Sequence, residues 1–298
     1  MSEPTDPPAQ PPAQPPKSEG DKPPLSVITP MPAQPQVSWL RRWITSVGET
    51  ITSLVLYCGG MMVMLGQSLV RGPRRPFALF DTSYQLLQLG IRSLPLTTLM
   101  SVFVGMILAW QFGEALNDFG AKNSIGYVTA LALVRELVPT LLAVTVGTKM
   151  ATGMTAELGS MKVTEQIDAI SALGADPIKK LVWPRLVAST LAMPLLVAWG
   201  NVLAMLGGML IADTVFDVPA GYFYATYIDE LEPLHYVMSQ TKALAFGMLA
   251  GLVGCYQGFT TKFGTEAVGQ STTETVIAVS VLVLLADFAL TTIFMPIG

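Results

Sequence analysis

Two adjacent ionisable residues, Arg135 and Glu136, stand inside an apolar stretch, where a charge is costly to bury and by default indicates function. Such a pair either serves a bound ligand or turns into a helix bundle and fixes its packing, and the residues alone leave both interpretations open. Pro139 has no N–H to donate to the carbonyl of Arg135, so we expect the helix to be bent or loosened beside this pair.

Lys242 and Asp287 are two further charges in apolar stretches, and Lys149 is a third. A lysine near a helix end can extend its ammonium to the membrane surface, which is the favoured interpretation for Lys242. Asp287 lies in the middle of its stretch, so it must pair within the bundle, and Lys242 is a plausible partner.

Several chemistries lack their usual parts. The chain has no Gly-rich phosphate loop, no His-Glu-x-x-His and no Gly-x-Ser-x-Gly, so it is predicted to be neither an ATPase on its own nor a hydrolase. Its single histidine, His235, and its two cysteines, Cys58 and Cys255, form no metal-ligand pattern. We therefore expect no metal and no cofactor bound by this chain.

The composition indicates a protein that is largely solvated by lipid. Of 298 residues, 51% are hydrophobic and 13% are charged, against roughly 25% charged in an ordinary soluble domain. The formal net charge of -4 offers no basic surface for nucleic acid.

Five stretches are long and apolar enough to cross a bilayer, which takes about 20 residues. They are residues 94–112, 125–155, 186–212, 236–259 and 276–296.

Lysine and arginine are retained on the cytoplasmic side of membrane proteins, and here they alternate with acidic loops. The basic segments contain Arg71, Arg74, Arg75, Arg92, Lys162, Lys179, Lys180, Arg185 and Lys262, whereas the loop between the third and fourth spans is acidic. This pattern predicts a cytoplasmic N-terminus and a C-terminus on the outer side of the membrane.

The N-terminal part is predicted to be different in kind. Residues 1–38 hold more than half of the 22 prolines and few large apolar side chains, which is typical of a disordered cytoplasmic tail. Trp39, Leu40, Trp43, Ile44 and Val47 share one helical face, which predicts an interfacial helix. The uncharged stretch from Thr50 to Val70 has arginines at both ends, which favours a helix on the inner leaflet over a crossing one.

A short amphipathic helix is predicted in the basic loop between the second and third spans. Val163, Ile167, Ile170 and Leu173 would form its apolar face, with Glu165, Gln166 and Asp168 opposite. Such a helix could contact a soluble partner or could pack only on its own domain.

The same region carries a long and specific motif. Arg135-Glu136-Leu137-x-Pro139, Ala156 to Ala169 (AELGSMKVTEQIDA), Leu173-Gly174-x-Asp176-Pro177 and Pro184-Arg185 resemble the MlaE/YrbE family of ABC-transporter permeases. The resemblance extends from about Arg41 to the C-terminus.

The resemblance implies an all-α integral membrane protein with an N-terminal interfacial helix, five transmembrane helices and a cytoplasmic coupling helix. In domain terms, residues 1–38 are the tail, 39–92 the interfacial and elbow helices, and 93–298 the permease domain with the coupling segment 157–177. The residues implied to meet the ATPase are Glu157, Lys162, Val163, Glu165, Gln166, Ile167, Asp168, Ile170 and Leu173; Arg135 and Glu136 would border a lipid pocket at a dimer interface.

The implied assembly is a homodimer in the bacterial inner membrane, driven by cytoplasmic ATPase subunits that bind ATP and Mg, with a periplasmic MCE-domain protein as the lipid carrier. Phospholipid is the expected cargo, and sterol or fatty acid is the alternative in the Mce-type branch. A secondary transporter is a more distant alternative, since the spans show no internal repeat.

One position departs from the family pattern. Where members commonly have Ala-Gly-Arg, this chain reads Val146-Gly147-Thr148-Lys149, so the positive charge has moved by one residue. That shift turns it by about 100° around a helix and replaces a planar guanidinium with an ammonium.

Overall fold

The computed structural model describes residues 39–73, 79–262 and 264–295. The chain divides into two units, Met1–Thr52 and Ser53–Gly298. Every regular element of the described residues is helical, which confirms the all-α class. The tail 1–38 and the side chains of the proposed interfacial face at Trp39, Leu40, Trp43, Ile44 and Val47 lie outside what is described, so both stay predictions.

The helices follow one another with short connections. The first are α1 (Trp39–Arg71), α2 (Leu79–Asp118), the 3₁₀ turn η1 (Lys122–Ser124), α3 (Ile125–Ala132), α4 (Val138–Leu142), α5 (Thr148–Val163) and α6 (Gln166–Ala172). They are followed by α7 (Trp183–Phe216), α8 (Ala220–Glu230), α9 (Pro233–Thr260) and α10 (Thr265–Phe294). Two π-helical turns join successive helices without a loop: η2 (Leu133–Leu137) lies between α3 and α4, and η3 (Ala143–Gly147) lies between α4 and α5. A further π turn, η4 (Ile178–Val182), follows the connection after α6 and leads directly into α7.

Six helical segments within the described residues are long and apolar enough to cross a membrane. They are Ile51–Arg71, Phe80–Asp118, Lys122–Val163, Ile178–Phe216, Pro233–Thr260 and Thr265–Phe294. The last five contain the five predicted spans, apart from the final residues of the fifth. The first contains most of the stretch Thr50–Val70, whose position on the inner leaflet stays a prediction, because length and composition alone do not separate a crossing helix from one in the membrane plane.

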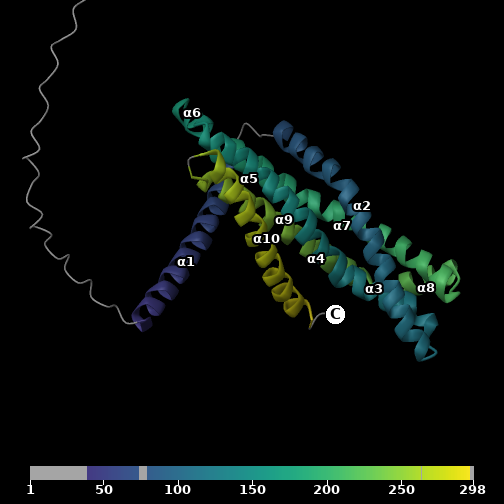
Figure 1. The fold of residues 1–298 in the computed structure, drawn as a ribbon. Coiled ribbons are helices and arrows are strands. Elements are labelled where there is room, and N and C mark those ends of the chain that lie inside the picture. The colour runs from purple at the N-terminus through teal and green to yellow at the C-terminus, as the bar shows by residue number, and fades with distance from the viewer. Residues whose placement is uncertain (1–38, 74–78, 263, 296–298) are drawn as a thin grey trace, which may run out of the picture. The chain divides into compact units, whose positions relative to one another are not determined.

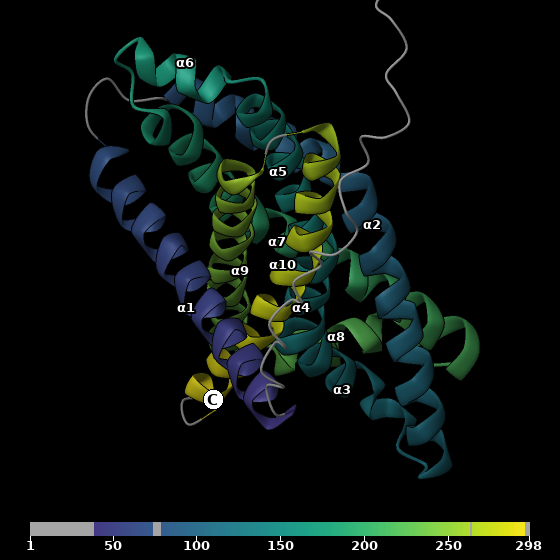
Figure 2. The same ribbon diagram turned by 60° about the vertical axis from the view of Figure 1, so that its left-hand side comes forward.

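Small residues bring α2 and α7 close together along their length (Figures 1 and 2). A Cβ atom on Gly105 would overlap the carbonyl of Ala204, and one on Gly207 would overlap the carbonyl of Val102. Glycine at these positions therefore lets the two backbones touch, which is how helices gain van der Waals contact in a lipid environment.

α9 carries a face of small residues, which contacts two neighbouring helices. Gly247 and Gly251 lie against Ser189 of α7, whereas Gly254 and Gly258 lie against Ala151 and Leu158 of α5. α9 is thereby packed between α7 and α5, which fixes the positions of its polar residues relative to these two helices.

The second unit has α6 at one end and α8 at the other (Figures 1 and 2). Lys162, Lys179 and Lys180 adjoin α6, together with the acidic residues Glu165 and Asp168. Asp217 and Asp229 lie beside or within α8.

We expect Gly105→Ala to lower the free energy of unfolding by about 1–3 kcal/mol, because the added methyl must separate two touching backbones. The matched control is Gly90→Ala in the same helix, where no atom lies within 4 Å of the added Cβ. Thermal unfolding of the purified protein in detergent measures both. Equal melting temperatures for the two variants would contradict this account of the α2–α7 contact.

Candidate functional site

The side chain of Lys242, on α9, is the buried centre of the site, with only 2% of it exposed. Its Nζ lies 2.6 Å from Oε2 of Glu136 and 3.0 Å from Oδ1 of Asp287. The sequence-based interpretation that Lys242 extends to the membrane surface is therefore wrong. The pairing of Asp287 with Lys242 is confirmed, and we call these residues together with Thr291 the ion cluster.

Two neutral oxygens complete the surroundings of the ammonium. Lys242 donates to the backbone carbonyl of Arg135 at 3.2 Å and to the hydroxyl of Thr291 at 2.7 Å. The Thr291 hydroxyl in turn donates to Oε2 of Glu136 at 3.2 Å. The cluster thus joins η2, α9 and α10, three elements far apart in the sequence.

The local chain explains why the carbonyl of Arg135 is available. In a regular helix it would accept from the N–H four residues later, and Pro139 has none. The helix is loosened here as predicted, in the form of the π turn η2. Lys242 therefore fills the vacancy that Pro139 leaves in the backbone ladder.

Arg135 does not share the pairing of its neighbour. Consecutive residues point about 100° apart around a helix, and no ion pair among the described residues involves Arg135. The cluster itself has two carboxylates, on Glu136 and Asp287, for the one ammonium of Lys242. A half-buried guanidinium without an ion pair is a ready donor for an anionic group.

The cluster opens to the surface through Glu136, whose side chain is 39% exposed, against 18% for Asp287. Beside it, α10 presents a large apolar face. Its exposed members are Ile277, Val281, Leu284, Leu285 and Phe288. The site is therefore open to the surface at Glu136 and lies next to the exposed apolar face of α10. We call these two surfaces together the open flank.

The predicted coupling helix differs from the observed one. The sequence predicts about three turns from Val163 to Leu173, but α5 continues to Val163 and α6 covers only Gln166–Ala172. Between them Glu165 adopts a left-handed backbone conformation, with φ of 59°. Lys162 and Asp168 pair at 3.0 Å across this turn.

Only part of the predicted apolar face of that helix is buried. Ile167 is buried and Ile170 packs on the core, but Leu173 is 86% exposed. Glu165, Gln166 and Asp168 are exposed, Lys162 and Val163 are half-buried, and Glu157 is held by Arg185 at 3.1 Å. The segment is thus anchored by Ile167 and Ile170, and it presents both charge and an uncovered leucine.

Lys149 does not join the ion cluster. Its ammonium donates to the backbone carbonyl of Arg92 at 2.5 Å, and both residues line a cavity between α2 and α5. Thr148, which stands where the family pattern has arginine, bonds back to the carbonyl of Val144.

Two contributors were missed from the sequence. Thr291 lies one helical turn after Asp287, so its position on the same face was a readable signal. Arg185 pairs with Glu157 across two helices, and no local spacing indicates that contact.

Comparison with known proteins now bears on this arrangement. The family described as Permease MlaE matches residues 82–293. A probable ABC transporter permease protein of Rickettsia prowazekii is 35% identical over 213 residues, which cover 72% of this chain and 82% of the relative.

Two other relatives have lipid names. The intermembrane phospholipid transport system permease protein MlaE of Haemophilus influenzae is 30% identical over 259 residues, 86% of this chain and 98% of the relative. The chloroplast protein Trigalactosyldiacylglycerol 1 of Arabidopsis thaliana is 35% identical over 232 residues, 78% of this chain and 66% of the relative.

The match includes the ion cluster and the segment around α6, and the chain has several helices able to span a membrane. The chain therefore belongs to the MlaE family of permeases and is a multi-pass membrane protein.

Proposed function

We propose that this chain is the permease subunit of an ABC transporter that moves phospholipid between the bacterial inner membrane and a periplasmic MCE-domain carrier. The observation that carries the proposal is the ion cluster: a built set of paired charges inside the membrane-spanning bundle, open to one side through Glu136. Ionisable groups inside a membrane bundle are costly to bury even when they pair with one another, and they commonly mark ligand pathways.

A two-chain lipid has a charged headgroup and apolar tails, and the open flank offers a surface for both. Arg135 is the unpaired cation for the phosphate, and the exposed face of α10 is the apolar wall. The names of the Haemophilus and Arabidopsis relatives both refer to glycerolipids, which supports this class over sterol.

A second copy of the chain is the proposed cover for this flank. In α10 only 11% of the most apolar window is buried within the chain. A homodimer that places two such faces together would enclose a lipid-sized space between two ion clusters.

Energy is proposed to enter at α6. A separate cytoplasmic ATPase would bind ATP and Mg, and this chain would bind no cofactor. Leu173 and the exposed charges of α6 form the contact, and Ile167 anchors it to the bundle. Movement of a partner against α6 would be transmitted through its core contacts and the turn at Glu165 into the bundle as a small shift. In this orientation the N-terminus is cytoplasmic and the C-terminus periplasmic.

The central experiment is transfer of a fluorescent phospholipid from vesicles that hold the permease with a cognate ABC ATPase. We expect transfer to require ATP. Transfer at the same rate without ATP would instead support a secondary transporter. Mass spectrometry of co-purified lipid tests the cargo, and sterol or fatty acid in place of phospholipid would contradict that part.

For the ion cluster, we expect Glu136→Lys to reduce lipid transfer at least ten-fold while the ATPase still co-purifies, because a second cation faces Lys242 at the open side. Glu114→Lys is the charge-matched control. Glu114 is exposed and lies near the C-terminal end of α2, so this variant should transport normally. Unchanged transfer by Glu136→Lys would assign Glu136 to packing alone.

For the coupling segment, we expect Glu165→Lys combined with Leu173→Ser to weaken ATPase binding by ten-fold or more, since both side chains are exposed and neither stabilises the fold. Asp229→Lys in α8, at the opposite end, is the control. The measurement is the amount of ATPase retained by the immobilised permease. If the double variant retains as much as the control, the contact lies elsewhere.

A further inference from the structure

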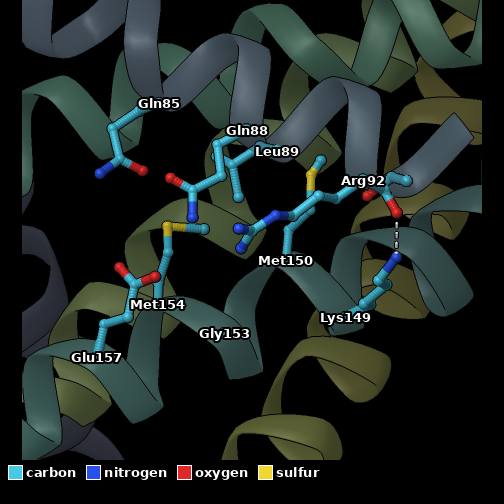
Figure 3. Close-up of a pocket in the computed structure, with 10 residues that line it drawn as sticks. Gln85, Gln88, Leu89, Arg92, Lys149, Met150, Gly153, Met154 and Glu157 are labelled. Carbon is cyan, nitrogen blue, oxygen red and sulfur yellow. Dashed lines mark hydrogen bonds between the residues drawn. The ribbon is translucent and has the colours of Figure 1, made fainter.

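The cavity between α2 and α5 is a second polar site, separate from the ion cluster. It has a volume of about 150 Å³. Figure 3 shows the side chains of Gln85, Gln88 and Arg92 on α2 and of Met154 and Glu157 on α5 around it. The displaced lysine of the family motif, Lys149, lies at its other end.

The cavity carries net positive charge. Arg92 and Lys149 form no ion pair within the described part of the chain. The one acid at the cavity, Glu157, is already neutralised by Arg185, whose side chain is 10% exposed. Two cations therefore face the space without a carboxylate of their own.

A backbone contact holds the Lys149 side chain at the cavity. Its ammonium donates to the carbonyl of Arg92, in the turn of α2 that precedes Pro95. An ammonium has three donors, so two remain for a ligand. The planar guanidinium of Arg92 can add a paired contact to phosphate oxygens.

The depth of the site selects its ligand. After Arg92 the chain is uncharged over residues 93–113, about the length of one membrane crossing, so Arg92 stands at the boundary between headgroups and hydrocarbon. Leu89, Met150 and Met154 supply an apolar floor beneath the polar rim. Basic pockets between helices at this level suit lipid headgroups.

We propose that this cleft binds the phosphate of an acidic phospholipid from the leaflet on the α6 side. Arg92 and Lys149 hold the phosphate, the amides of Gln85 and Gln88 donate to the headgroup, and the start of the acyl chains lies on the methionines. The site lies next to Glu157, at the level where α5 leads into α6, so an occupied cleft would link α2 to the segment that meets the partner. The proposal goes beyond the transport proposed above and does not depend on it.

The test uses the purified full-length chain without any ATPase, so its outcome is independent of transport. Native mass spectrometry in detergent with equal amounts of phosphatidylglycerol and phosphatidylcholine measures which lipid is retained. We expect preferential retention of phosphatidylglycerol, reduced about ten-fold in the Arg92→Gln, Lys149→Gln double variant, because two charge-assisted contacts are lost. No preference in the wild-type protein, or an unchanged preference in the double variant, would overturn the proposal.

Two further variants test whether the effect is specific to the cleft and whether it is independent of misfolding. Lys180→Gln removes an exposed charge at the same end but outside the cleft, and should retain the preference. If the double variant does not fold, Gln88→Glu decides, since it adds a negative charge to the cleft with little change of shape and should weaken phosphatidylglycerol retention. Retention unaffected by Gln88→Glu would contradict the assignment.

Soluble glycerol 3-phosphate separates a lipid site from a free phosphate site. It carries a glycerol-linked phosphate group without acyl chains, so we expect no displacement of phosphatidylglycerol at equal concentration. Displacement would mean that the cleft recognises the phosphate alone, and the lipid assignment would fail.

Discussion

A buried ammonium cannot be left without partners in an apolar bundle, and Lys242 imposes that requirement on three elements at once. Its contacts to Glu136, Asp287, Thr291 and the carbonyl of Arg135 hold η2, α9 and α10 in one arrangement. Breaking any one leaves a charge or a polar oxygen unpaired, which is costly in a low-dielectric interior. The contacts of the cluster are therefore interdependent. A ligand that displaces Glu136 would also change the contacts that α10 makes through Asp287 and Thr291.

Both notable lysines of the bundle donate to a backbone carbonyl of a neighbouring helix. Lys242 reaches the carbonyl of Arg135, which Pro139 leaves without its helical donor, and Lys149 reaches the carbonyl of Arg92 in the turn before Pro95. At Pro139 the ammonium from α9 replaces the lost backbone bond. Proline within a membrane helix is tolerated when a neighbour supplies the missing partner. Here the partner also brings a charge to the site, so backbone repair and ligand chemistry are provided by one side chain.

Sequence reasoning reached the helical class, the five spans and the pairing of Asp287, because each leaves a local pattern of hydropathy or an unavoidable charge. It did not reach the burial of Lys242, since a lysine ten residues into a helix can either extend to the surface or pair. It also misjudged the helix around Glu165, because the left-handed turn there uses a residue type that gives no signal. The contact of Arg185 with Glu157 depends on helix packing alone.

The π turns η2 and η3 change the direction in which the side chains after them point around the helix. Each adds one residue to the helix compared with a regular turn, so every side chain that follows is rotated by about 100° relative to a straight α-helix. Glu136, Lys149 and Glu157 lie along one continuous helical run that contains both turns. Deleting a single residue within η3 would leave the cluster at Glu136 in place while turning Lys149 out of its cleft and Glu157 away from Arg185. The orientation of Lys149 and Glu157 around the helix relative to the start of this run thus depends on the two inserted residues and not on the length of the run alone.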